Sequence, residues 1–95
     1  MRQITRSAIN AFMEGENFSK SNTEVFCTPT GVTLFLHNNP IARRFKDGSI
    51  QISSAGWQTN TTKERLNGIP GVSIVQKNFK WFLNEQPWDG SWITI

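Results

Sequence analysis

Hydrophobic and polar residues alternate along much of the chain, and this period of two is typical of half-buried strands. Val32, Leu34 and Leu36, for example, would point to one face of a sheet. Tight turns separate the strands, and Asp47-Gly48 is the strongest hairpin sequence among them. The strands are predicted at residues 24–28, 32–37, 41–46, 49–53, 72–76 and 80–84, with a short closing strand at 92–95.

Residues 6–14 have the spacing of an amphipathic helix instead. Ala8, Ile9, Phe12 and Met13 fall on one stripe. Thr5 is expected to cap the start of this helix, and Gly15 to end it. The stripe predicts packing against a sheet and not a partner-binding face.

A second helix is predicted at residues 62–67, in the longest non-strand interval of the middle of the chain. Thr61 and Glu64 have the spacing of a capping box. Gly68 is expected to close the helix in a left-handed conformation before Pro70. Leu66 and Ile69 are expected in the core, whereas Lys63, Arg65 and Asn67 are expected to face water.

Together these elements predict the α+β class, with an antiparallel sheet made of a meander plus a C-terminal hairpin, and two short helices. The 95 residues are expected to form one domain, with an N-terminal helix and loop at 1–19 and a core at 20–95. Four tryptophans and seven phenylalanines predict that aromatic packing supplies much of the stability.

The residues give little support to catalysis. His37 is the only histidine and Cys27 the only cysteine, so a disulfide framework, a His cluster and a cysteine zinc site are excluded. We expect Cys27 to be a buried structural thiol and His37 to lie at a strand end. A phosphate-binding loop is missing, and no apolar run approaches the about 20 residues of a membrane span. We therefore predict no enzyme, no catalytic residue, no metal, no cofactor and no membrane partner, and a small-molecule substrate is not expected.

Binding is better supported. The net charge of +3 permits a nucleic-acid partner without requiring one. Trp57, Phe79, Trp88 and Trp92 could stack on bases if exposed, although a core position is favoured for Trp57 and for Trp81. The candidate nucleic-acid-binding residues are Arg43, Arg44, Lys63, Arg65, Lys77 and Lys80.

Five short motifs together resemble a small domain of unknown function found in tailed-bacteriophage genomes. The most distinctive is GWxxNTTKxRLNG at residues 56–68, and the others are NTEV at 22–25, LxLHxNxIA at 34–42, WxLN at 81–84 and WxGxW at 88–92. The chain departs from the pattern at Asn78-Phe79 and at Glu85, where glycines are expected in hairpin turns. The resemblance implies a phage-encoded protein in the cytoplasm of an infected bacterium, and it brings no established activity.

Two functions follow as hypotheses. The first is an accessory binding module without catalysis that contacts nucleic acid through a basic face. The alternative is an inhibitor that occupies the surface of a host protein, such as a defence, transcription or replication enzyme. For that alternative Trp88 and Trp92 are the candidate interface residues, although the tail that carries them could equally be a lid over one end of the sheet.

Overall fold

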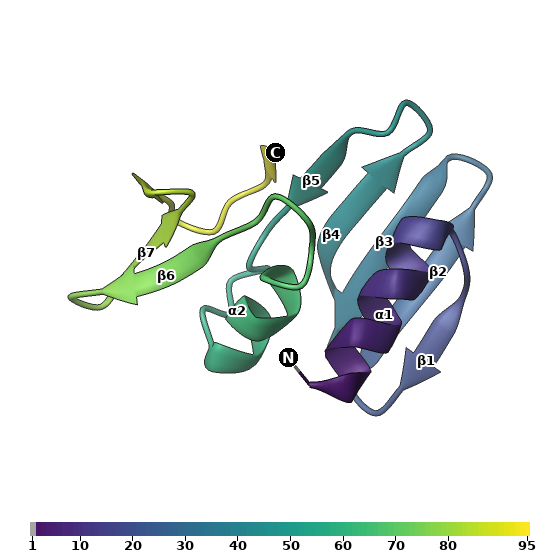
Figure 1. The fold of residues 1–95 in the computed structure, drawn as a ribbon, viewed down its shortest axis with the longest axis horizontal. Helices are drawn as coiled ribbons and strands as arrows, with labels where there is room; N and C mark the ends of the chain where they lie inside the picture. The colour runs from purple at the N-terminus through teal and green to yellow at the C-terminus, as the bar shows by residue number, and fades with distance from the viewer. Residues whose placement is uncertain (1) are drawn as a thin grey trace.

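Two helices and two antiparallel sheets make up residues 2–95, the part of the chain that the computed structural model describes (Figure 1). This confirms the predicted α+β class. In chain order the elements are α1 (Gln3–Glu14), β1 (Phe18–Lys20), β2 (Thr23–Thr28), β3 (Gly31–Leu36), β4 (Asn39–Phe45), β5 (Ile50–Ile52), α2 (Asn60–Leu66), β6 (Ile74–Lys77), β7 (Lys80–Leu83), β8 (Gln86–Pro87) and β9 (Ile93–Thr94).

The large sheet is the predicted meander, with one strand added at each edge. Its order is β1-β2-β3-β4-β5-β9, and α1 lies across one of its faces (Figure 1). The register shifts between Leu34 and Phe35, so that Ile41 and Ala42 are both buried where strict alternation predicts only one of them inside. The small sheet, β6-β7-β8, contains the predicted C-terminal hairpin and reaches away from α1.

Three hairpins have two-residue turns in which both residues are left-handed although neither is glycine. Such turns match the twist of the flanking strands, and asparagine tolerates the conformation well. The turns at Asn78-Phe79 and at Asn84-Glu85 show that the two departures from the phage motif leave tight hairpins in place. The residues in question are His37 and Asn38, Asn78 and Phe79, and Asn84 and Glu85.

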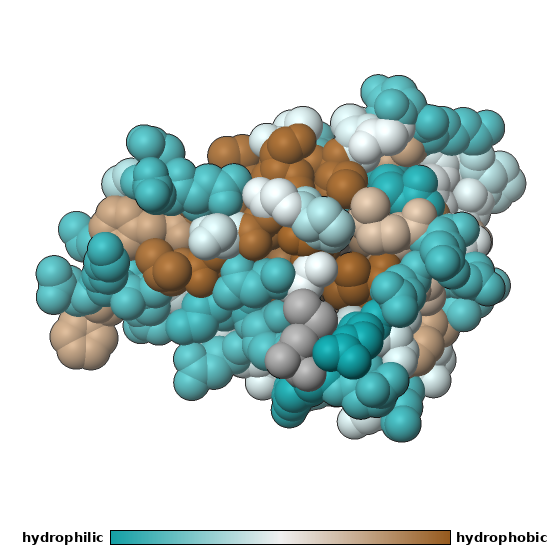
Figure 2. Space-filling model, viewed as in Figure 1, coloured by the Kyte–Doolittle hydropathy of each residue, from teal (hydrophilic) through white to brown (hydrophobic). Residues whose placement is uncertain are grey.

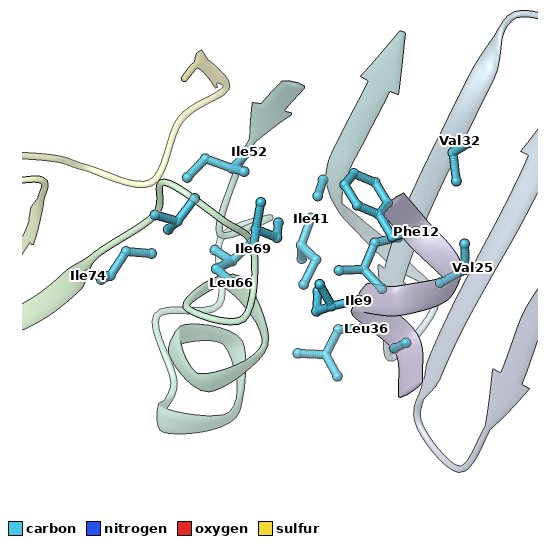
Figure 3. Packing of buried hydrophobic residues seen from close by; sticks show 14 of the residues in the cluster. Ile9, Phe12, Val25, Val32, Leu36, Ile41, Ile52, Leu66, Ile69 and Ile74 are labelled. Atoms are coloured by element: carbon cyan, nitrogen blue, oxygen red, sulfur yellow. The ribbon is translucent and has the colours of Figure 1, made fainter. Parts of the chain in front are cut away.

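One hydrophobic cluster joins both helices to both sheets (Figure 3). Ile9 and Phe12 of α1 enter it from one side, so the N-terminal helix is part of the core and not an addition to it. Leu66 and Ile69 occupy the middle, as predicted. Ile74, Trp81, Leu83 and Trp88 carry the cluster into the small sheet.

Both predicted helix starts are wrong. Helix α1 begins at Gln3, with Arg2 as its N-cap, and Thr5 is buried inside the helix. Helix α2 begins at Asn60, and Thr59 caps it by accepting a 3.2 Å hydrogen bond from the backbone N–H of Thr62. The capping box of Thr61 and Glu64 does not form.

The reason is a buried polar network that uses the same side chains. Arg65, expected to face water, is 1% exposed. Its guanidinium donates to the hydroxyl oxygens of Thr5 (2.7 Å) and Thr23 (3.0 Å) and to the Glu64 carboxylate. The Thr5 hydroxyl also donates to Glu64. Arg65 thereby joins α2 to α1 and β2, and Thr5 and Glu64 are not free to cap helices.

Gly68 is required for a different reason from the predicted one. Its φ is not left-handed, but a Cβ at this position would lie 2.8 Å from Ile9 Cγ1 and 3.0 Å from Thr5 Cγ2. The glycine therefore allows α1 to approach the end of α2 closely. The Asn67 side chain pairs with both backbone groups of Ile74 (2.6 and 3.1 Å), which fixes the start of β6 against α2.

The network makes the free energy of unfolding depend on pH in the acidic range. Partial burial alone would raise the pKa of Glu64, but hydrogen bonds from Thr5 and the Arg2 backbone, with the charge of Arg65, hold it below the ordinary value of 4.5. The folded state therefore binds this proton less readily than the unfolded state. The stabilisation is present above about pH 4.5 and is lost as the pH falls through the lower folded pKa.

We expect Glu64→Gln to weaken this dependence, measured as the free energy of unfolding from denaturant titrations between pH 7 and pH 2.5. Some slope should remain, because hydrogen bonds from Ser49 and Ser91 lower the pKa of Asp47 and of Asp89. An unchanged slope in Glu64→Gln would show that the carboxylate does not stabilise the fold in this way.

Candidate nucleic-acid interface

Three of the six predicted basic residues are held by other parts of the fold. Arg65 is buried in the network described above, so it cannot reach a phosphate. The Arg44 Nε donates a 3.0 Å hydrogen bond to the carbonyl of Phe12, which ties it to the end of α1. The Arg43 guanidinium lies 3.9 Å from the centroid of the Trp92 ring, in a cation–π contact.

Lys77 and Lys80, by contrast, are brought together. They face each other across the β6–β7 hairpin, so both side chains point to the same face of the small sheet. The next pair on that face is Val75 with Phe82, and Phe82 also pairs with Pro87 of β8. Because the alternate pair, Ile74 with Leu83, is buried, the lysine face is the outer one.

The hairpin tip carries an exposed aromatic side chain next to the two lysines in sequence. Phe79 is 93% exposed and has a φ of 67°, a left-handed conformation that is unfavourable for a bulky residue. In the space-filling view an apolar group projects at the end of the hairpin, with hydrophilic surface around it (Figure 2). Packing does not explain a fully exposed phenylalanine in a strained position.

The charge at the tip is uncompensated. Two ammonium groups directly opposite each other on a hairpin repel, which costs stability. Both ion pairs found within residues 2–95 use Glu64, with Arg2 and with Arg65. Lys77 and Lys80 therefore have no carboxylate partner in that part of the chain, and a bound anion would relieve their repulsion.

Lys63 stands apart from the hairpin face. It lies on α2, half-buried beside Asn60 and Asn67 in a shallow hollow that also includes Glu64. The structure thus brings together two of the six predicted residues and separates the other four.

The buried and exposed tryptophans differ from those predicted. Trp81 is buried as expected, but Trp57 is 60% exposed, so its predicted core position is wrong. Trp88, a candidate interface residue, is 8% exposed and packs on Trp81, with ring centroids 6.1 Å apart. It is part of the core and unavailable to a partner. Trp92 is partly exposed under Arg43.

The comparisons with known proteins give the origin of the chain. A family model described as Kyanoviridae Gp96 protein matches residues 1–94. The chain belongs to this family. The Kyanoviridae Gp96 family is a bacteriophage protein family of unknown function, which confirms the phage resemblance. Neither the curated proteins nor the solved structures gave a match.

The one histidine and the one cysteine of this Kyanoviridae Gp96 chain do not meet. Cys27 lies opposite Val32, whereas His37 follows Leu36, so about 13 Å of β3 separates the two levels. His37 is an exposed turn residue, as predicted, with Nε2 3.4 Å from the Asn22 amide nitrogen. Cys27 is half-buried against the core.

Two further kinds of feature are absent from residues 2–95. No group of three or more His, Cys, Asp or Glu side chains is placed to hold a metal ion. No helix in this range is both long and apolar enough to cross a membrane.

The C-terminal segment is bound to the rest of the fold, and β9 pairs with β5 at the edge of the large sheet. The Gly90 carbonyl accepts hydrogen bonds from Ser54 N (2.8 Å) and from the Ser53 hydroxyl (3.0 Å). The Trp88 Nε1 donates to the Ser91 carbonyl (2.9 Å). These bonds fix residues 88–91 against the chain that follows β5.

Sequence reasoning missed the outward aromatic and apolar residues of the small sheet, Phe82 and Val75. Their alternation with Trp81 and Ile74 was available as a signal. No local pattern indicated that Trp57 is exposed, because its position is fixed by a tight turn that is itself bound to residues distant in sequence.

Gly90 allows a test of the contact between residues 88–91 and Ser54. It has a φ of 90°, and a Cβ there would lie 2.2 Å from the Ser54 hydroxyl oxygen. We expect Gly90→Ala to lower the free energy of unfolding by about 2–4 kcal/mol, through backbone strain plus overpacking. Gly48 has the same φ with nothing within 4 Å, so Gly48→Ala is the matched control and should cost about 1–2 kcal/mol. Equal losses in denaturant titrations would show that the contact with Ser54 does not matter.

Proposed function

We propose that the protein is a phage-encoded accessory binding module, without catalysis, that contacts nucleic acid through the outer face of the β6–β7 hairpin. Its place of action would be the cytoplasm of the infected bacterium. The observation that carries the proposal is the pairing of Lys77 with Lys80 beside the exposed Phe79.

The lysine pair suits a phosphate backbone. Both lysines are exposed and each ammonium group has three donors, so together they form a doubly positive site at the end of the hairpin. Lysine contacts to phosphate position a protein on nucleic acid without reading its sequence. We therefore expect binding that is weakly specific and strongly dependent on salt.

The aromatic residues suit bases. Phe79 projects from the tip, and the half-buried Phe82 lies on the same outer face as the lysines. Stacking on exposed aromatic side chains tolerates any base, since every base has a π face. Lysines beside exposed aromatics on a sheet face are the usual components of single-strand binding surfaces.

The proposal predicts that Lys77→Glu with Lys80→Glu abolishes measurable binding to short DNA or RNA at low salt. The wild type should show a slope of log K against log salt near −1.4 on single strands, about −0.7 for each of two neutralised phosphates. Fluorescence anisotropy with a labelled oligonucleotide of mixed sequence measures both quantities.

The matched control is Lys20→Glu with Lys46→Glu, which changes the net charge equally at two exposed lysines away from the hairpin. This control should retain most of the affinity and the same salt slope. Equal weakening in the two double variants would show that overall charge, and not the hairpin, attracts the nucleic acid. The absence of binding to any oligonucleotide at low salt would contradict the proposal itself.

A second candidate, inhibition of a host protein, is favoured by one observation. The face of the large sheet opposite the core has a row of paired residues, Phe26, Thr33, Arg43 and Gln51. Phe26 is 52% exposed, and Trp92 stacks under Arg43. Aromatic and arginine side chains within a polar surround are typical of protein interfaces.

For this candidate the expected result is capture of one bacterial protein from host lysate, at moderate salt and after nuclease treatment. Phe26→Ala with Arg43→Ala should abolish the capture while thermal unfolding stays cooperative, because neither side chain is in the core. The Lys77 and Lys80 double variant is the control and should capture the same protein. A partner that nuclease releases would count against this candidate.

A further inference from the structure

A cavity of about 490 Å³ lies beside the exposed Trp57, where the chain passes from β5 to α2. This volume is within the range of small-ligand sites. Most of its exposed lining is apolar. The lining residues are Leu36, His37, Asn39, Ile41, Ser54, Ala55, Trp57, Thr59, Thr61 and Thr62.

Trp57 is held at this cavity by a strained turn. Ala55 and Gly56 are both left-handed, with φ of 54° and 82°, and the Trp57 N–H donates to the Ser54 carbonyl at 2.9 Å. Ser54 is 2% exposed and is itself bound to Gly90. The turn is therefore anchored to the core, and it places a large flat indole in solvent at a conformational cost that packing does not require.

Other lining residues supply polar groups that hydrogen bonds hold in place. Thr59 is fixed as the N-cap of α2. The Asn39 amide nitrogen donates to the His37 carbonyl at 3.2 Å, which orients its amide oxygen as a free acceptor. None of the lining side chains is a carboxylate. Apolar side chains, the flat indole of Trp57 and polar groups without a carboxylate fit a planar heterocycle with a polar edge.

Two residues that are adjacent in sequence, Trp57 and Gln58, link the cavity to the tip of the β6–β7 hairpin. Gln58 follows Trp57 and lines a second hollow together with Phe79, Lys80 and the acidic Asp89. Its side-chain nitrogen donates to the Asp89 carbonyl at 3.0 Å, so its position is fixed. A single strand whose phosphates lie at the lysines would have to run past Gln58 to place a base at Trp57.

We propose that the cavity takes an unpaired nucleobase, stacked on Trp57, from a single strand bound at the β6–β7 hairpin. This rests on the proposed function and adds the class of nucleic acid, single-stranded instead of duplex. Paired bases are stacked on one another inside the helix and cannot enter such a cavity without being extruded.

The test compares a 12-nucleotide single strand with its own duplex, at one low salt concentration, by fluorescence anisotropy. The wild type should bind the single strand roughly tenfold or more tightly, the effect of one base–aromatic stack. Trp57→Ala should lose this preference while its salt slope on the single strand stays unchanged, because no phosphate contact is removed. Lys77→Gln with Lys80→Gln should reduce the slope instead.

Two further variants control for the fold. Thr61→Phe keeps Trp57 and fills the cavity from a half-buried position on α2, and it should lose the preference in the same way. Phe26→Ala removes an exposed aromatic side chain that does not line the cavity, and it should keep the preference. Thermal unfolding confirms that each variant is folded.

Each outcome decides the inference. Loss of the preference in both Trp57→Ala and Thr61→Phe, with Phe26→Ala unaffected, supports it. Binding that needs the two lysines but treats single strand and duplex alike, or that survives both cavity variants, overturns it and leaves the proposed function standing. The absence of binding to either form overturns both.

Discussion

The burial of one arginine sets the arrangement of this protein. The Arg65 guanidinium carries a charge that is costly to remove from water, and it is tolerated because Thr5, Thr23 and Glu64 accept its hydrogen bonds. These acceptors come from α1, β2 and α2, so the charge can be satisfied only when the three elements take one relative position. Deletion of a single acceptor would leave a buried donor unpaired, which makes the network specific as well as stabilising.

Both candidate surfaces depend on this arrangement. Asn67, two residues after Arg65, binds both backbone groups of Ile74 and fixes the start of the β6–β7 hairpin. At the other end of α2, the Thr59 cap fixes the segment that carries Trp57 and Gln58. A hairpin tip with an exposed phenylalanine and two repelling lysines has little stability of its own. It is held in place because the buried side of the small sheet belongs to the same core.

The sequence was sufficient for the longer strands, but it missed the short strands β1 and β8 and misplaced the helix starts, and the reason is physical. Alternation reports which face of a strand is buried, a local property that residues 32–37 show clearly. Capping depends on which acceptors remain free, and Thr5 and Glu64 are taken by partners distant in sequence. The sequence also led to the expectation that Arg65 faces water, because its hydrogen-bond partners Thr5 and Thr23 are distant in sequence. The lysine pair followed from a hairpin prediction, whereas the exposure of Trp57 and the burial of Trp88 depend on contacts between residues 53–54 and 90.

The most distinctive motif, residues 56–68, therefore combines two kinds of constraint. The fold explains four of its residues. Arg65 forms the buried network and Leu66 lies in the core. Asn67 fixes the start of β6, and Gly68 allows α1 to approach α2 closely. The fold does not explain Trp57, because a smaller apolar residue could bury as much apolar surface at this position. A left-handed turn that places a tryptophan in solvent costs stability, so the binding of a partner is the simpler explanation for it. The same argument applies to Phe79, which lines a hollow together with Gln58, the residue that follows Trp57.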